Sequence, residues 1–183
     1  AVIAGLEKAP AAAVPALLDV LGRLGGAEAL AVVKKRAAAD DADIAKAAIK
    51  AMVGWPDTSP MDALLKIAET EKDAVRKILA LQGFITMAGR PSSRPLEQTV
   101  ALLEKAMTLA ERADEKRAIL SRLPDFATEK SLAIAEKFTG DTALKKEASR
   151  AVAEIKKVLS RPAATASKNQ NKAARALDGN AKS

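Results

Sequence analysis

The sequence contains no cysteine, no histidine and no tyrosine among its 183 residues. These absences exclude disulfide bonds, metal sites built on thiolate or imidazole ligands, and catalysis by a cysteine nucleophile or a histidine general base. Carboxylates, Lys, Arg, Ser and Thr remain for chemistry. The lack of cysteine fits either a reducing or an oxidising compartment. The sequence also shows no signal peptide and no apolar run long enough to span a bilayer.

Aromatic residues are scarce as well. They make up 2% of a chain that is 49% hydrophobic, so its apolar side chains are mostly those of Ala, Leu, Val and Ile. Small aliphatic side chains suit helices packed closely on helices, whereas sheets favour β-branched and aromatic residues. We therefore expect an all-α protein. The chain opens at Ala1 rather than Met, which predicts a segment of a longer polypeptide.

The net charge of +7 is unevenly distributed along the chain. Residues 161–183 hold five basic residues and one acidic residue, which leaves 25 basic against 22 acidic residues over 1–160. Lys and Arg in the longer part stand beside Asp and Glu, as on a solvated helical surface. The nearly balanced charge of residues 1–160 therefore gives only weak support for a partner that is a polyphosphate, such as a nucleic acid.

Apolar residues recur at three- and four-residue steps through most of the chain, which indicates amphipathic helices. The central stretch, residues 40–88, contains the pattern of one helical pair, followed by an approximate repeat of it. The helices predicted from this pattern cover residues 2–8, 12–24, 27–38, 44–52, 61–68, 74–88, 96–110, 114–123, 128–138 and 141–159. Beyond Pro162 the helical period disappears.

Local signals place the ends of these helices. Gly25-Gly26 is a left-handed terminator, and Ser59-Pro60 predicts a cap followed by a first-turn proline. The stretch Asp40-Asp41-Ala42-Asp43 fits either a calcium loop or a helix N-terminus. We favour the N-terminus, because an EF-hand glycine and a distal bidentate Glu are missing. Gly83, inside a helix, predicts the close approach of a neighbouring helix, and residues 89–95 form the longest predicted loop of the body.

The second helix of each predicted pair repeats along the chain. Its equivalent starts, Ile44, Val75, Lys116 and Leu144, are spaced by 31, 41 and 28 residues, and the long interval contains the loop at residues 89–95. Three of these starts follow an acidic residue and precede a basic one, as in Asp73-Ala74-Val75-Arg76. A helical pair of this size cannot bury its apolar face alone, so we expect the pairs to stack.

This pattern resembles HEAT repeats, the armadillo-like α-solenoid family. The resemblance covers about residues 1–160 and implies an α-α superhelix of about four helical pairs plus a leading half-repeat. In that family the acidic and basic residues often bridge neighbouring units. Lys116 departs from the pattern, since it places a charge at an apolar position.

Residues 161–183 are a different kind of sequence, which we predict to be an extended, non-helical tail or linker. Taken alone, the polar Ala/Asn/Lys composition is that of a terminal segment. Residues 164–167 and Ala176-Leu177-Asp178-Gly179-Asn180 also resemble the start of a discoidin-type (factor type C) β-sandwich. With the helical repeats, this is similar to large bacterial secreted proteins that carry carbohydrate-related domains. The resemblance implies an extracytoplasmic location, secreted or periplasmic.

The leading hypothesis for function is a non-catalytic interaction or spacer scaffold that serves a protein partner or neighbouring domains. Trp55, Arg90 and Arg94 are the predicted contacts, because Trp and Arg are enriched at binding hot spots. Packing of Trp55 at its turn beside Pro56 is the alternative. We expect no catalytic residue, no cofactor, no metal and no membrane contact.

Two other functions follow from particular residues. Binding to a nucleic-acid backbone would place five basic residues on one surface, namely Lys46, Lys50, Arg76, Lys77 and Arg117. An enzyme would draw its acids from four carboxylates, namely Asp57, Asp62, Asp125 and Glu129. Each of these carboxylates stands at a predicted helix start, where capping explains it, so the chain is not expected to be an enzyme.

Overall fold

The computed structural model describes residues 2–161, and every regular element among them is a helix. The all-α prediction is confirmed. In chain order the elements are α1 (Val2–Lys8), the 3-10 turn η1 (Ala11–Ala13), α2 (Val14–Leu24), α3 (Ala27–Ala37), α4 (Ala42–Val53), α5 (Met61–Thr70), α6 (Ala74–Ala88), α7 (Leu96–Leu109), α8 (Ala113–Arg122), η2 (Leu123–Phe126), α9 (Glu129–Glu136) and α10 (Lys145–Leu159). The predicted discoidin-type segment lies outside the described residues.

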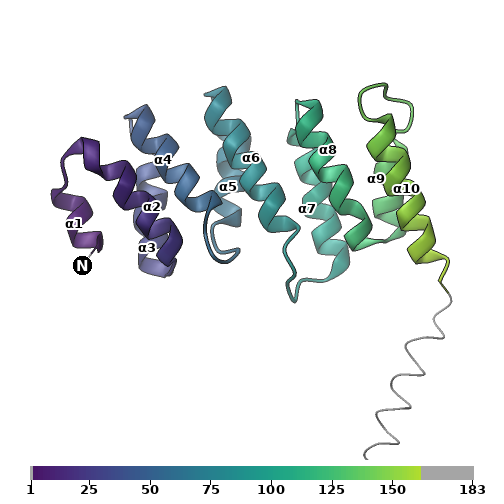
Figure 1. The fold of residues 1–183 in the computed structure, drawn as a ribbon, viewed down its shortest axis with the longest axis horizontal. Helices are drawn as coiled ribbons and strands as arrows, with labels where there is room; N and C mark the ends of the chain where they lie inside the picture. Colours follow the sequence, from purple (N-terminus) through teal and green to yellow (C-terminus); the bar gives the residue numbers. More distant parts are fainter. Residues whose placement is uncertain (1, 162–183) are drawn as a thin grey trace, which may run out of the picture.

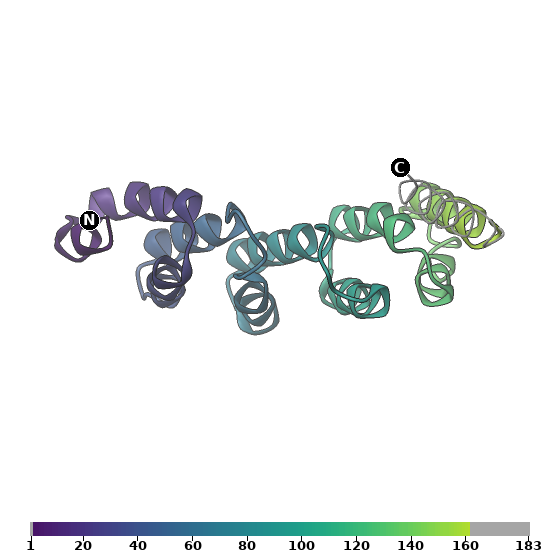
Figure 2. The same ribbon diagram turned by 90° about the horizontal axis from the view of Figure 1, so that it is seen from below.

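The helices are arranged as pairs that follow one another in a row (Figure 1). Helix α3 packs on α4, α5 on α6, α7 on α8 and α9 on α10. Helices α2, α4, α6, α8 and α10 form one layer, in which each contacts the next. Figure 2 shows this layer along the inner edge of a shallow arc, with α3, α5, α7 and α9 on the outer side. The row therefore has two faces, and each is formed by a different set of helices.

A hydrophobic cluster runs along the row from Leu6 in α1 to Ile155 in α10. Many of its fully buried members are alanines, including Ala48 in α4, Ala80 in α6 and Ala148 in α10. A methyl side chain lets two helix axes approach closely. The low aromatic content and high alanine content of the sequence thus correspond to closely packed helix pairs.

Gly83 shows how close the approach is. A Cβ at this position would lie 2.6 Å from Cγ2 of Val53 and 3.1 Å from Cδ1 of Leu64. Val53 belongs to α4 and Leu64 to α5, so α6 is pressed against two neighbouring helices at this point. The predicted helix contact at Gly83 is confirmed. Gly22 in α2 has the same role, because its Cβ would lie 2.7 Å from the carbonyl oxygen of Ala51.

The predicted helix ends are largely confirmed. Gly25 and Gly26 have φ angles of 72° and 94°, which favour glycine, and they end α2. The Asp41 carboxylate accepts hydrogen bonds from the amides of Asp43 and Ile44, so the stretch of residues 40–43 contains a helix N-terminus.

Two local predictions are wrong, the cap at Ser59 and the helix start at residue 141, and one further helix begins with a different kind of turn. Ser59 does not cap α5, because its hydroxyl and its amide both donate to the Asp57 carboxylate. The helix predicted from residue 12 begins with the 3-10 turn η1, since Pro15 has no N–H to donate to the carbonyl of residue 11. The helix predicted from residue 141 begins at Lys145, after a turn closed on the carbonyl of Asp141.

Candidate interaction surfaces

Trp55 lies inside the core. Its side chain is 0% exposed, and it belongs to the hydrophobic cluster together with residues of α2 and α4. A Cβ on Gly25 would lie 2.7 Å from Cγ of Pro56, so the turn that carries Trp55 packs tightly against the end of α2. The ring is not presented to a partner in this structure. The position of Trp55 agrees with the alternative interpretation, in which the ring packs at its turn beside Pro56.

Arg90 and Arg94 hold the loop of residues 89–95 onto the helices. The Arg90 guanidinium donates to the carbonyl oxygens of Trp55 at 2.9 Å and Asp57 at 3.1 Å. Arg94 donates to the carbonyl of Ala88 at 3.3 Å and to the hydroxyl of Thr99 at 3.4 Å. The structure thus brings Trp55 and Arg90 together as an internal joint between two loops. Both arginines are partly exposed, and their role as partner contacts stays a prediction.

Ion pairs connect successive units on both layers. On the outer layer Lys105 of α7 pairs with Glu69 of α5 at 2.6 Å, and Lys130 of α9 pairs with Glu104 of α7 at 2.6 Å. On the inner layer Lys77 of α6 pairs at 2.5 Å with Glu111, which precedes α8. Some charged side chains on the surface of the row therefore hold one helix pair in a fixed position relative to the next pair.

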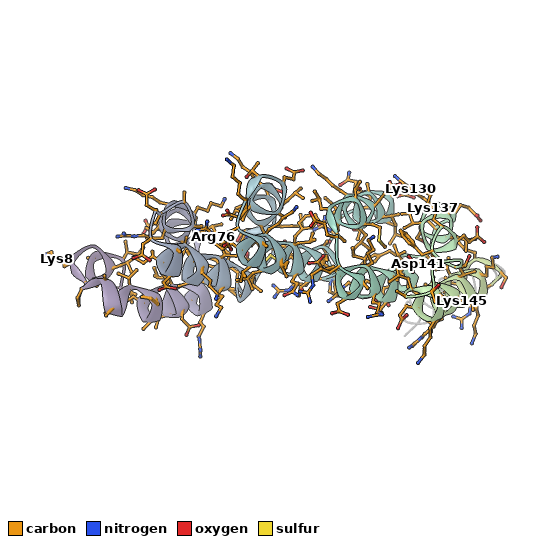
Figure 3. All side chains as sticks on the ribbon, turned by 90° about the horizontal axis from the view of Figure 1, so that it is seen from above. Lys8, Arg76, Lys130, Lys137, Asp141 and Lys145 are labelled. Carbon is orange, nitrogen blue, oxygen red and sulfur yellow. The ribbon has the colours of Figure 1, made fainter. Side chains whose placement is uncertain are left out.

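The acidic and basic residues of the repeat behave differently in two units. Arg117 pairs with Asp114 at 2.7 Å and donates to the carbonyl of Ala143, which belongs to the next unit. Arg76 instead pairs with Glu71 at 3.1 Å, within its own unit. Figure 3 shows Arg76 in the space between the two layers. The bridging role that the resemblance implies is present at Arg117 and absent at Arg76.

The five basic residues of the nucleic-acid alternative do not form one basic surface. Arg76, Lys77 and Arg117 are engaged by carboxylates, as described above. Lys46 and Lys50 line a hollow between α2 and α4 that also contains two carboxylates, those of Asp19 and Asp43. These carboxylates reduce the positive potential that a phosphate backbone requires.

The four carboxylates of the enzyme alternative stand where helices or turns begin. Asp62 and Glu129 lie in the first turns of α5 and α9, and Asp125 lies in the first turn of η2. Hydrogen bonds from the hydroxyl and amide of Ser59 hold the pKa of Asp57 below its usual value. A carboxylic acid that acts as a general acid needs a raised pKa, whereas the pKa of Asp57 is lowered. Among residues 2–161, no three carboxylates are grouped closely enough to hold a metal ion.

A groove that the sequence did not indicate lies between α3 and α5. It has a volume of about 680 Å³. Residues from four helices, from the end of α3 and from the loop between α5 and α6 line it: Lys34, Ala37, Ala38, Met52, Ala63, Lys66, Ile67, Thr70, Glu71, Lys72, Asp73 and Arg76. We call it the α3–α5 groove. No local sequence signal marks it, because its two walls belong to different repeat units.

Comparison of the chain with protein-family models, with curated proteins and with solved structures finds no match. The HEAT-type and discoidin-type resemblances therefore stay predictions. None of the helices within residues 2–161 is both long enough and apolar enough for a membrane crossing. The surfaces described above are the basis for a functional proposal.

Proposed function

We propose that residues 1–160 form a HEAT-like α-α superhelix that serves as a non-catalytic interaction or spacer scaffold. The scaffold would hold a protein partner or neighbouring domains of a larger extracytoplasmic, carbohydrate-related polypeptide. The observation that carries the proposal is the continuous hydrophobic cluster along a row of helix pairs. The location and the carbohydrate link rest on the resemblance alone.

A row of this kind resists bending for a physical reason. Each pair buries its apolar face against the next pair. Separating two neighbouring pairs would expose this apolar surface, at a free-energy cost of about 25 cal/mol per Å². Ion pairs such as Lys105–Glu69 and Lys130–Glu104 add a register between units, each with the modest strength of a partly exposed pair. A stiff, extended row is suited to setting the distance between two attached domains.

Spin-label distance measurements test the scaffold proposal directly. The chain has no native cysteine, so pairs of labels enter without background at Ala16→Cys in α2, Gln82→Cys in α6 and Lys157→Cys in α10, three exposed positions. We expect a narrow distance distribution for each of the three label pairs, the end-to-end pair included. A broad or multiple end-to-end distribution, with narrow distributions within each half, would show a hinged chain and contradict the spacer role.

A further inference from the structure

The α3–α5 groove keeps apolar side chains accessible. Ala37 on one side and Ala63 and Ile67 on the other are half-buried, and Met52 of α4 is fully buried beneath them. A trough between two neighbouring helices matches the shape that receives the apolar face of an amphipathic segment. Its volume of about 680 Å³ is enough for several side chains of such a segment.

The rim of the groove is basic. Lys34, Lys66 and Lys72 are exposed there, and none of the three has an ion-pair partner among residues 2–161. The two carboxylates of the lining are already engaged. Glu71 pairs with Arg76 at 3.1 Å, and Asp73 lies 3.9 Å from the same guanidinium. Against these two carboxylates the lining places four basic residues. The charge left for a partner is therefore positive.

We propose that the α3–α5 groove binds an acidic amphipathic segment of a protein partner. Its apolar side chains would lie on Ala37, Ala63 and Ile67, and its carboxylates would face the lysines of the rim. This inference rests on the proposed interaction role and names the surface and the chemistry of the partner. It places the contact between α3 and α5 of the outer layer, in a groove that Trp55, Arg90 and Arg94 do not line.

The chain's own C-terminal segment has the wrong charge for this groove. Residues 162–183 contain four basic residues and one acidic residue, so the lysine rim repels them. The hollow between α2 and α4 is lined by two lysines and two aspartates, so its lining has no net charge to attract a charged segment. The positive charge of the rim thus favours the α3–α5 groove over the hollow between α2 and α4, and it favours an acidic occupant over a basic one.

Panning of a displayed library of random peptides, long enough for about three helical turns, on the full chain tests the proposal. We expect enriched peptides that combine Asp or Glu with large apolar residues at helical spacing. Their affinity, measured by fluorescence anisotropy, should fall roughly tenfold in a Lys34→Glu/Lys66→Glu variant and should fall with added salt. Both substitutions are at exposed positions, and circular dichroism verifies that the variant is folded.

The matched control is Lys137→Glu/Lys145→Glu, which makes the same charge change at two exposed lysines near α9 and α10 (Figure 3). It should leave peptide affinity within about twofold of the parent chain. Three results would overturn the proposal: no enrichment, enriched peptides without acidic residues, or equal loss in both variants. Self-association that the groove variant abolishes would also overturn it, because the occupant would be a second copy.

The spin-label distances separate failure of this inference from failure of the scaffold role. A groove that binds nothing, with narrow end-to-end distances, leaves the scaffold proposal intact. A broad end-to-end distribution with normal peptide binding contradicts the spacer role alone. The groove variant itself should keep the distances of the parent chain, since neither lysine belongs to the core.

Discussion

Gly83 lies in the middle of α6, where a glycine normally costs helix stability. Replacing it by alanine would gain up to about 1 kcal/mol of helix propensity. The added Cβ would however lie 2.6 Å from Cγ2 of Val53, closer than side chains pack, and overpacking costs about 1–3 kcal/mol. We expect the clash to win, so that Gly83→Ala lowers the free energy of unfolding by about 1 kcal/mol in urea denaturation.

Two further variants isolate the clash. In a Val53→Ala background the nearest obstructing methyl group is gone and the contact at 3.1 Å with Cδ1 of Leu64 remains, so Gly83→Ala should there cost less stability than in the parent chain. Gly5→Ala in α1 is the matched control, because nothing lies within 4 Å of its Cβ and only the helix-propensity gain applies. If Gly83→Ala and Gly5→Ala change the stability equally, the close approach of α4 to α6 is not the reason for the glycine.

Asp57 gives a pH-dependent prediction at the same scale. The Ser59 hydroxyl, then the Ser59 amide, hold the pKa of Asp57 below its usual value of 3.8. Because the pKa is lower in the folded state, the ionised carboxylate favours folding. That stability is fully present above the unfolded pKa and is lost as the pH falls through the folded pKa. Ser59→Ala should therefore raise the Asp57 pKa, as followed by NMR titration of its carboxyl carbon.

The stability difference between the parent chain and Ser59→Ala should accordingly shrink as the pH is lowered below about 4. Ser121→Ala is a suitable comparison, since that hydroxyl donates to the carbonyl of Ala118 rather than to a carboxylate. Its effect on stability should not change over the same pH range. An Asp57 pKa that stays put in Ser59→Ala would refute the assignment.

At the scale of the elements, Arg90 joins two loops that lie between helices. Its guanidinium donates to two backbone carbonyls, those of Trp55 and Asp57. Hydrogen bonds from a charged donor contribute about 1.5–3 kcal/mol when buried, and less at a partly exposed site such as this one. We expect Arg90→Ala to lower the free energy of unfolding by about 1–2 kcal/mol in denaturant titration.

Arg23→Ala provides the control for Arg90. Arg23 pairs with Asp19 one turn earlier in α2, and both side chains are more than half exposed. Such surface pairs contribute only about 0.3–0.5 kcal/mol. Comparable losses in the two variants would mean that Arg90 does not hold the loops together, and its role would then be sought in partner binding.

The helices were predictable because their signals are local. Gly25 ends α2 through its own φ angle, and Asp41 starts α4 through amides two and three residues away. The misplaced cap at Ser59 has a local cause too, since the neighbouring Asp57 competes for its hydroxyl. Trp55 was ambiguous, because burial of an aromatic ring depends on residues distant in sequence. The α3–α5 groove was missed for the same reason.

At the scale of the whole molecule, the row differs from a closed bundle in how local damage spreads. In a bundle every helix touches the same core, whereas here α5 packs chiefly on α6 and does not reach α9 or α10. A row behaves as a chain of units coupled to their neighbours. Destabilising one unit should therefore affect adjacent units strongly and distant ones weakly.

Leu64→Ala tests this behaviour. Leu64 of α5 is 0% exposed, and removing its side chain should lower the stability of its unit by about 2–5 kcal/mol. Native-state hydrogen exchange should then accelerate strongly in α5 and α6 and much less in α9 and α10. The mirror variant Ile155→Ala in α10, also 0% exposed, should reverse the pattern. Equal acceleration along the whole chain in either variant would show one undivided cooperative core, and the stacked-unit interpretation would fail.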